Sequence, residues 1–215
     1  MNKIKYLIKE VEEKEVLDLG CVAHNLDLIK KQGNKWMHQI IKDNSKEVIG
    51  LDNDKKMIKV LNNKGFKMIH GNAENFNLNK KFDVIFAGEL IEHLTNLEGF
   101  FNSIKNNLKE NGKFILTTPN STRINAFLRI LLKGKSIESP YHTLTFNAFL
   151  IKNILKNNGF NNIKIFHSNA DYIADKNYLY WFLSFIRKEF KSNLIVECSY
   201  NNEISQNTFK EKEQW

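Results

Sequence analysis

Two short apolar runs of this sequence end in residues that could bind a nucleotide. Residues 16–21 read Val-Leu-Asp-Leu-Gly-Cys, and residues 48–52 read Val-Ile-Gly-Leu-Asp. A glycine that follows a buried strand lets the backbone approach a ligand closely. A carboxylate at the end of the next strand can accept hydrogen bonds from the hydroxyls of a ribose. Gly20 and Asp52 are therefore the first candidates for a nucleotide site.

The loop after Gly20 departs from the glycine-rich pattern of dinucleotide sites. Val22 stands where a second glycine is expected, and its branched side chain restricts the backbone. Asp52 follows Gly20 by 32 positions, against about 20 in a dinucleotide fold. Both features count against a dehydrogenase. We expect residues 24–35 to form a longer loop, and we interpret 36–38 (Trp-Met-His) as part of a packed helix.

Two histidines are candidates for a general base, because histidine titrates near neutral pH. His93 follows the apolar run 82–87, and His142 lies in a Ser-Pro-Tyr-His loop. Each also has a structural alternative: His93 could bind a loop backbone, and His142 could serve as a cap. Glu89, Glu92 and His93 are chemically suited to bind a divalent ion. Their spacing is generic, and we predict no metal site.

Apolar runs of strand length alternate with helix-length segments along most of the chain, which predicts an α/β fold. We expect a Rossmann-like, doubly wound, seven-stranded sheet. The last strand follows a helix, so we expect it to insert antiparallel at the sheet edge. Thr145 is the predicted N-cap of the last long helix. The predicted strands are 15–19, 47–51, 66–70, 82–87, 113–118, 162–167 and 194–198, and the predicted helices are 35–42, 54–63, 95–108, 122–132 and 145–158.

Composition indicates one folded domain over residues 1–215. Apolar residues make up 42% of the chain, which is enough for a core. The formal charge is +8, but the lysines are scattered, which favours solvated helix faces over a nucleic-acid partner. Two distant cysteines indicate neither a disulfide framework nor a zinc site. With no signal-peptide pattern at the start and no long apolar run, we expect a cytoplasmic protein.

Five segments in the same order resemble the class I S-adenosylmethionine-dependent methyltransferases. The two runs described above are the first two of these segments. The third is the Gly-Asn-Ala-Glu-Asn-Phe loop at 71–76, and the fourth is the strand and loop at 82–94, which contains Ile-Glu-His-Leu. The fifth, at 108–120, ends in Thr-Thr-Pro-Asn. The resemblance is to the bacterial and archaeal small-molecule branch, similar to enzymes of ubiquinone and menaquinone biosynthesis.

The resemblance implies S-adenosyl-L-methionine as cofactor and an oxygen of a small molecule or glycan as methyl acceptor. Asp18 would orient the methionine ammonium, and Asp52 would bind the ribose. Asn72 replaces the usual aspartate, and its carbonyl can still accept from the adenine amine. His142 and His93 are the candidate bases. The expected cofactor-binding residues are Asp18, Gly20, Cys21, Val22, Asp52, Asn53, Asn72, Ala73, Glu74, Ala87, Gly88 and Glu89.

Two other functions stay open from the sequence. The net charge would suit an RNA or protein methyltransferase, although no Asn-Pro-Pro-Tyr-like motif follows the fourth strand. Val22 and Asn72 would suit a degenerate fold that acts as a binding subunit. We expect the substrate side to be formed by residues 134–144 and 169–191. The aromatic segment 178–191 fits a peripheral membrane contact, a homodimer face or substrate lid, or a buried crossover helix, which we favour.

Overall fold

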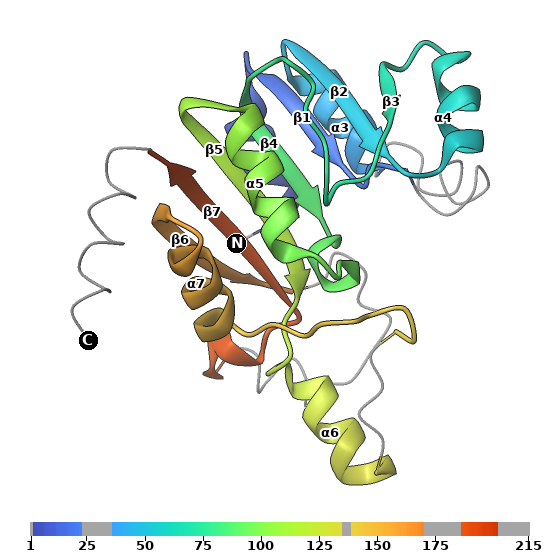
Figure 1. Cartoon of the computed structure of the whole chain (residues 1–215). Helices are drawn as coiled ribbons and strands as arrows, with labels where there is room; N and C mark the ends of the chain where they lie inside the picture. Colours follow the sequence, from blue (N-terminus) through green and yellow to red (C-terminus); the bar gives the residue numbers. More distant parts are fainter. Residues whose placement is uncertain (1, 23–35, 135–138, 170–185, 202–215) are drawn as a thin grey trace.

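A central sheet organises the computed structural model, which describes residues 2–22, 36–134, 139–169 and 186–201 (Figure 1). Within these residues the sheet has seven strands in the order β3-β2-β1-β4-β5-β7-β6. Neighbours from β3 to β5 run parallel, and β7 runs antiparallel to both β5 and β6. The expected seven-stranded, mostly parallel sheet is confirmed. Its strands are β1 Glu15–Leu19, β2 Glu47–Asp52, β3 Met68–His70, β4 Phe82–Gly88, β5 Leu108–Pro119, β6 Phe160–Ser168 and β7 Asn193–Tyr200.

The antiparallel direction of the last strand is confirmed, but its predicted place at the edge is wrong. β7 lies between β5 and β6, and β6 forms the edge. Five consecutive residues of β7 are buried, whereas the exposed positions of β6 alternate with better-covered ones. A strand that is buried on both faces and mostly apolar gains most from the interior of a sheet. A strand that carries asparagine and lysine on one face is better suited to the edge.

Helices cover both faces of the sheet. One face carries a core that contains Leu17 and Leu19 of β1, and the other carries a core that contains Val16. This alternation follows from the two-residue period of a strand. In Figure 1, α5 and α7 lie over one face, and α6 extends away from the sheet. The helices are α1 Lys3–Val11, α3 Met37–Asn44, α4 Lys55–Asn62, α5 Leu97–Asn107, α6 Ile124–Lys133 and α7 Ala148–Asn157, with 3-10 turns η2 Ile91–His93 and η3 Lys188–Phe190.

The helices differ from the sequence predictions in an additional helix, α1, and in the N-cap of α7. Helix α1 was not predicted, and it packs Leu7 and Val11 against the sheet, with Asn2 as its N-cap. The predicted N-cap Thr145 of α7 is wrong. Asn147 caps that helix, and its side-chain oxygen accepts from Leu150 N–H at 2.9 Å. Threonine and asparagine can both cap a helix. The cap is the residue at which the backbone changes from extended to helical geometry, and here that residue is Asn147.

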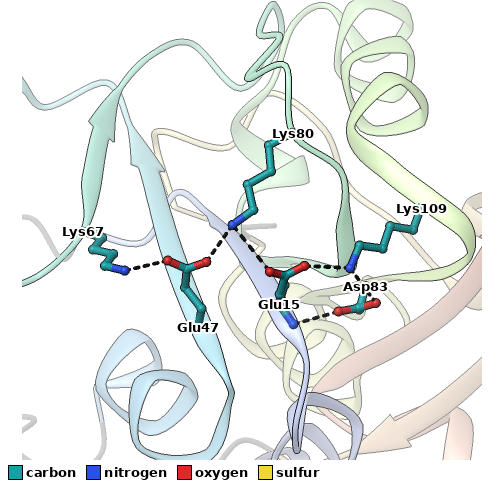
Figure 2. A network of polar contacts seen from close by, with 6 residues as sticks. All are labelled: Glu15, Glu47, Lys67, Lys80, Asp83 and Lys109. Carbon is teal, nitrogen blue, oxygen red and sulfur yellow. Dashed lines mark hydrogen bonds and ion pairs between the residues drawn. The ribbon is translucent and has the colours of Figure 1, made fainter.

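An ion-pair network joins the amino ends of three neighbouring strands (Figure 2). Lys80 Nζ lies 2.6 Å from Glu47 and 3.8 Å from Glu15, and it bridges β2 and β1. Lys109 Nζ continues the network, at 2.7 Å from Glu15 and 3.1 Å from Asp83 of β4. The network thus links the amino ends of these strands, at the opposite end of the sheet from their carboxyl ends. The ligand site of an open α/β sheet lies at the carboxyl ends.

Some sequence expectations fall outside the described residues. These are the long loop at 24–35, part of the 134–144 loop, and most of the crossover segment 169–191 with its proposed membrane and dimer contacts. Within the part of the chain that is described, no helix is both long enough and apolar enough to cross a membrane.

Candidate active site

Gly20 begins the loop at the carboxyl end of β1. Its φ of +66° is a conformation that favours glycine. Its N–H donates to Leu51 O at 2.9 Å, which joins the loop to β2. A side-chain carbon at this position would lie 2.9 Å from Leu90 Cδ1. The backbone conformation therefore favours glycine here, and a larger residue would also have to displace the Leu90 side chain.

Asp52 ends β2 and holds the same loop from the other side. One carboxylate oxygen accepts from Val22 N–H at 2.9 Å, and the other accepts from Asp54 N–H at 3.0 Å. Each oxygen of a carboxylate has a second acceptor position, so both can still accept from a ligand hydroxyl. Val22 packs its side chain beside the apolar cluster that contains Trp36. A valine is thus accommodated at this position, because its contact with Asp52 is made by the backbone N–H and not by the side chain.

Asp18 is buried beneath the loop, with 2% of its surface exposed. Its Oδ2 lies 2.8 Å from Nδ1 of His38, which is also buried. Burial raises the pKa of the Asp18 carboxyl, and the hydrogen bond with His38 partly offsets this effect. The helix-packing interpretation of 36–38 holds for Trp36 and His38, which are buried. The pairing of His38 with Asp18 was not predicted.

The loop after β3 is held to the start of α5. Glu74 Oε1 accepts from the N–H groups of Thr95 and Asn96, both at 2.6 Å. These backbone donors, that of Asn96 foremost, lower the pKa of Glu74. Asn72 Oδ1 accepts from Glu74 N–H at 2.9 Å, and Ala73 packs against the main core. The loop is thus shaped by its own polar side chains before any ligand binds.

The carboxyl end of β4 carries the next expected group. Ala87 is fully buried, and a side-chain carbon at Gly88 would lie 2.9 Å from the ring of Phe86. Glu89 has a φ of +50°, which is uncommon for a residue with a side chain. Its Oε1 accepts from Thr117 Oγ1 at 2.8 Å. The Glu89 carboxylate therefore contacts β5. Asn53, which follows Asp52 at the end of β2, is exposed.

The two candidate bases lie against each other. The rings of His93 and His142 meet edge to face with centroids 4.8 Å apart. His93 Nδ1 lies 3.0 Å from Tyr141 O, and the N–H groups of Thr143 and Leu144 donate to Glu92 O at 2.8 and 3.1 Å. These bonds hold the 141–144 segment against η2, which follows β4. The two histidines that the sequence offered as alternative bases thus lie in contact with each other.

Glu92 stands beside this histidine pair and was not among the predicted site residues. It is 2% exposed, and its Oε2 accepts from Thr118 Oγ1 of β5 at 3.0 Å. Ligand atoms of Glu92, His93 and His142 lie within 4.8 Å of one another. A second such group, within the described residues, comprises Asp18, Cys21 and His38. Glu89, which the sequence grouped with Glu92 and His93, belongs to neither set. The Ile-Glu-His-Leu run was the available signal for Glu92.

A model of a methyltransferase domain family matches residues 2–165. The chain belongs to this methyltransferase family. The match includes the Gly20 loop, Asp52 and the η2 turn with His93, and it confirms the family expected from the five ordered segments. It ends within β6.

Relatives of this methyltransferase-family chain include a mitochondrial ubiquinone biosynthesis O-methyltransferase of Schizosaccharomyces pombe, which is 27% identical over 145 residues. That match covers 67% of this chain and 52% of the relative, so the chain spans about half the length of that curated protein.

Solved structures confirm the class I methyltransferase fold. An S-adenosylmethionine-dependent methyltransferase of Archaeoglobus fulgidus superposes with a TM-score of 0.61 at 18% identity, over 90% of this chain and 89% of its own. A glycopeptide N-methyltransferase in complex with S-adenosylhomocysteine gives 0.62 at 14% identity, over 93% and 89%. At these identities the likeness is one of fold.

Proposed function

We propose that this protein transfers a methyl group from S-adenosyl-L-methionine to a hydroxyl oxygen of a small molecule. The observation that carries the proposal is the position of the His93–His142 pair. His93 follows β4 at the carboxyl end of the parallel strands and contacts His142, and at the same end Gly20 follows β1 and Asp52 ends β2. A carboxylate that could bind a ribose and an imidazole that could accept a hydroxyl proton thus lie at the same end of the parallel strands.

The chain carries the groups that the cofactor needs. Asp52 retains acceptor positions for the ribose hydroxyls while its backbone contacts to Val22 and Asp54 fix the carboxylate. Asp18, held by His38, is the proposed partner of the methionine ammonium. The other proposed contacts surround these two along the same edge, and they come from Gly20, Cys21, Asn53, Asn72, Ala73, Glu74, Ala87, Gly88 and Glu89.

The histidine pair supplies the proton chemistry. When bound, the cofactor would supply a methyl group on a positively charged sulfur: the acceptor oxygen would attack the methyl carbon in line, and the sulfur would leave with the electrons of the carbon–sulfur bond as S-adenosylhomocysteine. We propose that His142 accepts the hydroxyl proton as the new carbon–oxygen bond forms. His93, whose Nδ1 is engaged by Tyr141 O, orients that ring. Buried Glu92 lies beside the pair and holds the 141–144 backbone in place.

Relatives favour oxygen as the acceptor atom. The Schizosaccharomyces pombe relative is named a ubiquinone biosynthesis O-methyltransferase, and a relative with the same enzyme name, 26% identical over 157 residues, occurs in Rickettsia bellii. The glycopeptide neighbour is an N-methyltransferase. An amine acceptor is therefore the competing candidate. An amine acceptor is less favoured, because an amine that is uncharged at neutral pH is already nucleophilic and would not need the histidine pair as a base.

The experiment is done in two steps on the purified protein. Calorimetry with S-adenosylhomocysteine tests the cofactor, and no binding at high micromolar concentration would overturn the proposal. Methyl transfer from labelled S-adenosylmethionine is then compared across catechols, phenols, sugars and anilines of matched shape. We expect label on a hydroxyl compound and a strong loss of turnover in His142→Asn. Label confined to anilines would establish an N-methyltransferase. Binding without transfer to any acceptor would favour a binding subunit.

A further inference from the structure

A thiol, a thioether and an imidazole meet in the apolar cluster below the Gly20 loop. Cys21 Sγ lies 3.6 Å from Met68 Sδ, and both residues are buried at 7% exposure. Cys21 Sγ, a ring nitrogen of His38 and a carboxylate oxygen of Asp18 lie within 4.8 Å of one another. These groups come from the ends of β1 and β3 and from α3. The proposed methyl transfer uses neither sulfur.

Gly50 of β2 leaves the space in which these groups meet. A side-chain carbon at Gly50 would lie 2.4 Å from Met68 Sδ, 2.6 Å from Cys21 Sγ and 3.0 Å from Cε1 of His38. Any larger residue at position 50 would displace both sulfurs. Cε1 is bonded to both ring nitrogens, so the imidazole borders the same space with its nitrogen-bearing edge.

His38 is arranged as metal-binding histidines are. Its Nδ1 pairs with Asp18 Oδ2 at 2.8 Å, while its Nε2 is buried and has no hydrogen-bond partner among the residues that the structure describes. The ring is 1% exposed and packs against the rings of Trp36 and Phe66. A histidine ligand usually donates one ring N–H to a carboxylate and binds the metal through the other nitrogen. A buried imidazole nitrogen without a partner is otherwise unfavourable.

We propose that Cys21 Sγ, Met68 Sδ and His38 Nε2 bind one monovalent copper ion, with Asp18 orienting the imidazole. Two sulfurs 3.6 Å apart subtend a near-tetrahedral angle at an ion about 2.3 Å from each. Thiolate and thioether ligands suit soft Cu(I), whereas protein zinc sites are built from cysteine, histidine and carboxylate ligands. Binding replaces the Cys21 sulfur–hydrogen bond with a sulfur–copper bond and releases one proton to solvent, with no change of oxidation state.

The ion would act on the start of the cofactor loop. Cys21 is adjacent to Val22, whose N–H reaches Asp52, and Trp36 Nε1 donates to Cys21 O at 3.0 Å. A bound ion would therefore fix the backbone that positions Asp52. The copper site itself does not depend on the proposed methyl transfer, since it is measured by metal binding alone.

The test is anaerobic competition for Cu(I) between the full chain and a chromophoric Cu(I) chelator. We expect the protein to retain one equivalent, and X-ray absorption to report two sulfur neighbours and one nitrogen. Cys21→Ser should lose stoichiometric binding, and Met68→Leu, which conserves volume, should weaken it at least tenfold. Cys198→Ser, which changes the buried cysteine of β7, is the matched control and should bind as the parent does.

Several results would overturn the copper site. The proposal is overturned if the protein retains no copper, if Cys198→Ser loses as much copper binding as Cys21→Ser, or if X-ray absorption reports no sulfur neighbours. Zinc that binds in preference to copper and is unaffected by Met68→Leu would replace the proposal with a zinc site of Asp18, Cys21 and His38. Since Met68→Leu keeps the core volume, its binding result stands even if Cys21→Ser fails to fold.

Discussion

Replacement of Asp52 by asparagine tests how this protein holds its cofactor. The carboxylate receives backbone N–H groups from Val22 and Asp54, one on each oxygen. Asparagine has the same shape but only one acceptor oxygen. In either orientation its amide N–H₂ faces one of these two donors, and the ribose loses one charged acceptor.

The expected cost follows from these contacts. A hydrogen bond to a charged group contributes about 1.5–3 kcal/mol. A change of about 1.4 kcal/mol is tenfold in affinity, so Asp52→Asn should raise the Kd for S-adenosylhomocysteine roughly ten- to 150-fold. The facing amide and backbone donors should also lower the melting temperature. We therefore expect weaker binding in a protein that is folded at 25 °C but less stable.

Calorimetry with S-adenosylhomocysteine measures the Kd, and thermal unfolding measures the loss of stability. Asp54→Asn is the matched control. Asp54 caps α4 through Lys56 N–H and Met57 N–H, and asparagine caps equally well. Its Kd should stay within about twofold of the parent. A Kd for Asp52→Asn that also stays within twofold would refute the placement of the ribose at Asp52.

The other predictions concern the ion-pair network, the histidine pair and a helix cap. Hydrogen bonds from Lys67 and Lys80 lower the pKa of Glu47 from 4.5 to about 2. A lowered folded-state pKa stabilises the fold above pH 4.5, and this contribution is lost as the pH falls towards 2. Glu47→Gln should therefore cost roughly 1 kcal/mol of unfolding free energy at pH 7, after allowance for screening, and much less near pH 2, as measured by urea unfolding at each pH. His142→Asn should lower kcat about 100-fold or more with little change in the KM for S-adenosylmethionine, in steady-state assays of methyl transfer. Asn147→Ala should cost about 1 kcal/mol of stability, measured by urea unfolding, because α7 loses its cap.

Each of these predictions has a control within the chain. Glu110→Gln changes an exposed glutamate and should alter stability by less than 0.5 kcal/mol at any pH. An equal effect of Glu47→Gln at pH 7 and pH 2 would contradict the pKa argument. His167→Asn, on edge strand β6, should leave kcat unchanged. Asn147→Ser should retain most of the cap, and a full loss there would mean that the cap is not the cause.

Local sequence was enough to predict most of the framework. Apolar runs bounded by glycine, asparagine and charged residues mark strands, because a strand of a parallel sheet is buried on both faces and is therefore a nearly continuous apolar run. Asp52 ends such a run, so its place at the carboxyl end of the sheet, where ligands bind in open α/β folds, could be predicted without coordinates. Gly20 could be predicted for the same reason, and its φ of +66° fits the requirement for glycine.

Contacts between distant segments were decided only in the tertiary structure. The insertion of β7 between β5 and β6 depends on hydrogen bonds that only a folded sheet can make. His93 and His142 are 49 positions apart, and they meet because the 141–144 backbone binds η2. His38 reaches Asp18 from a separate helix.

The division has one physical reason. Periodicity and turn chemistry act between residues a few positions apart, so the sequence by itself determined the strands, most helices, the Gly20 turn and the carboxylate of Asp52. Side-chain partnerships across the sheet depend on which segments the core brings together. The histidine pair, the Asp18–His38 pair and the two sulfurs beside Gly50 were therefore decided by packing alone.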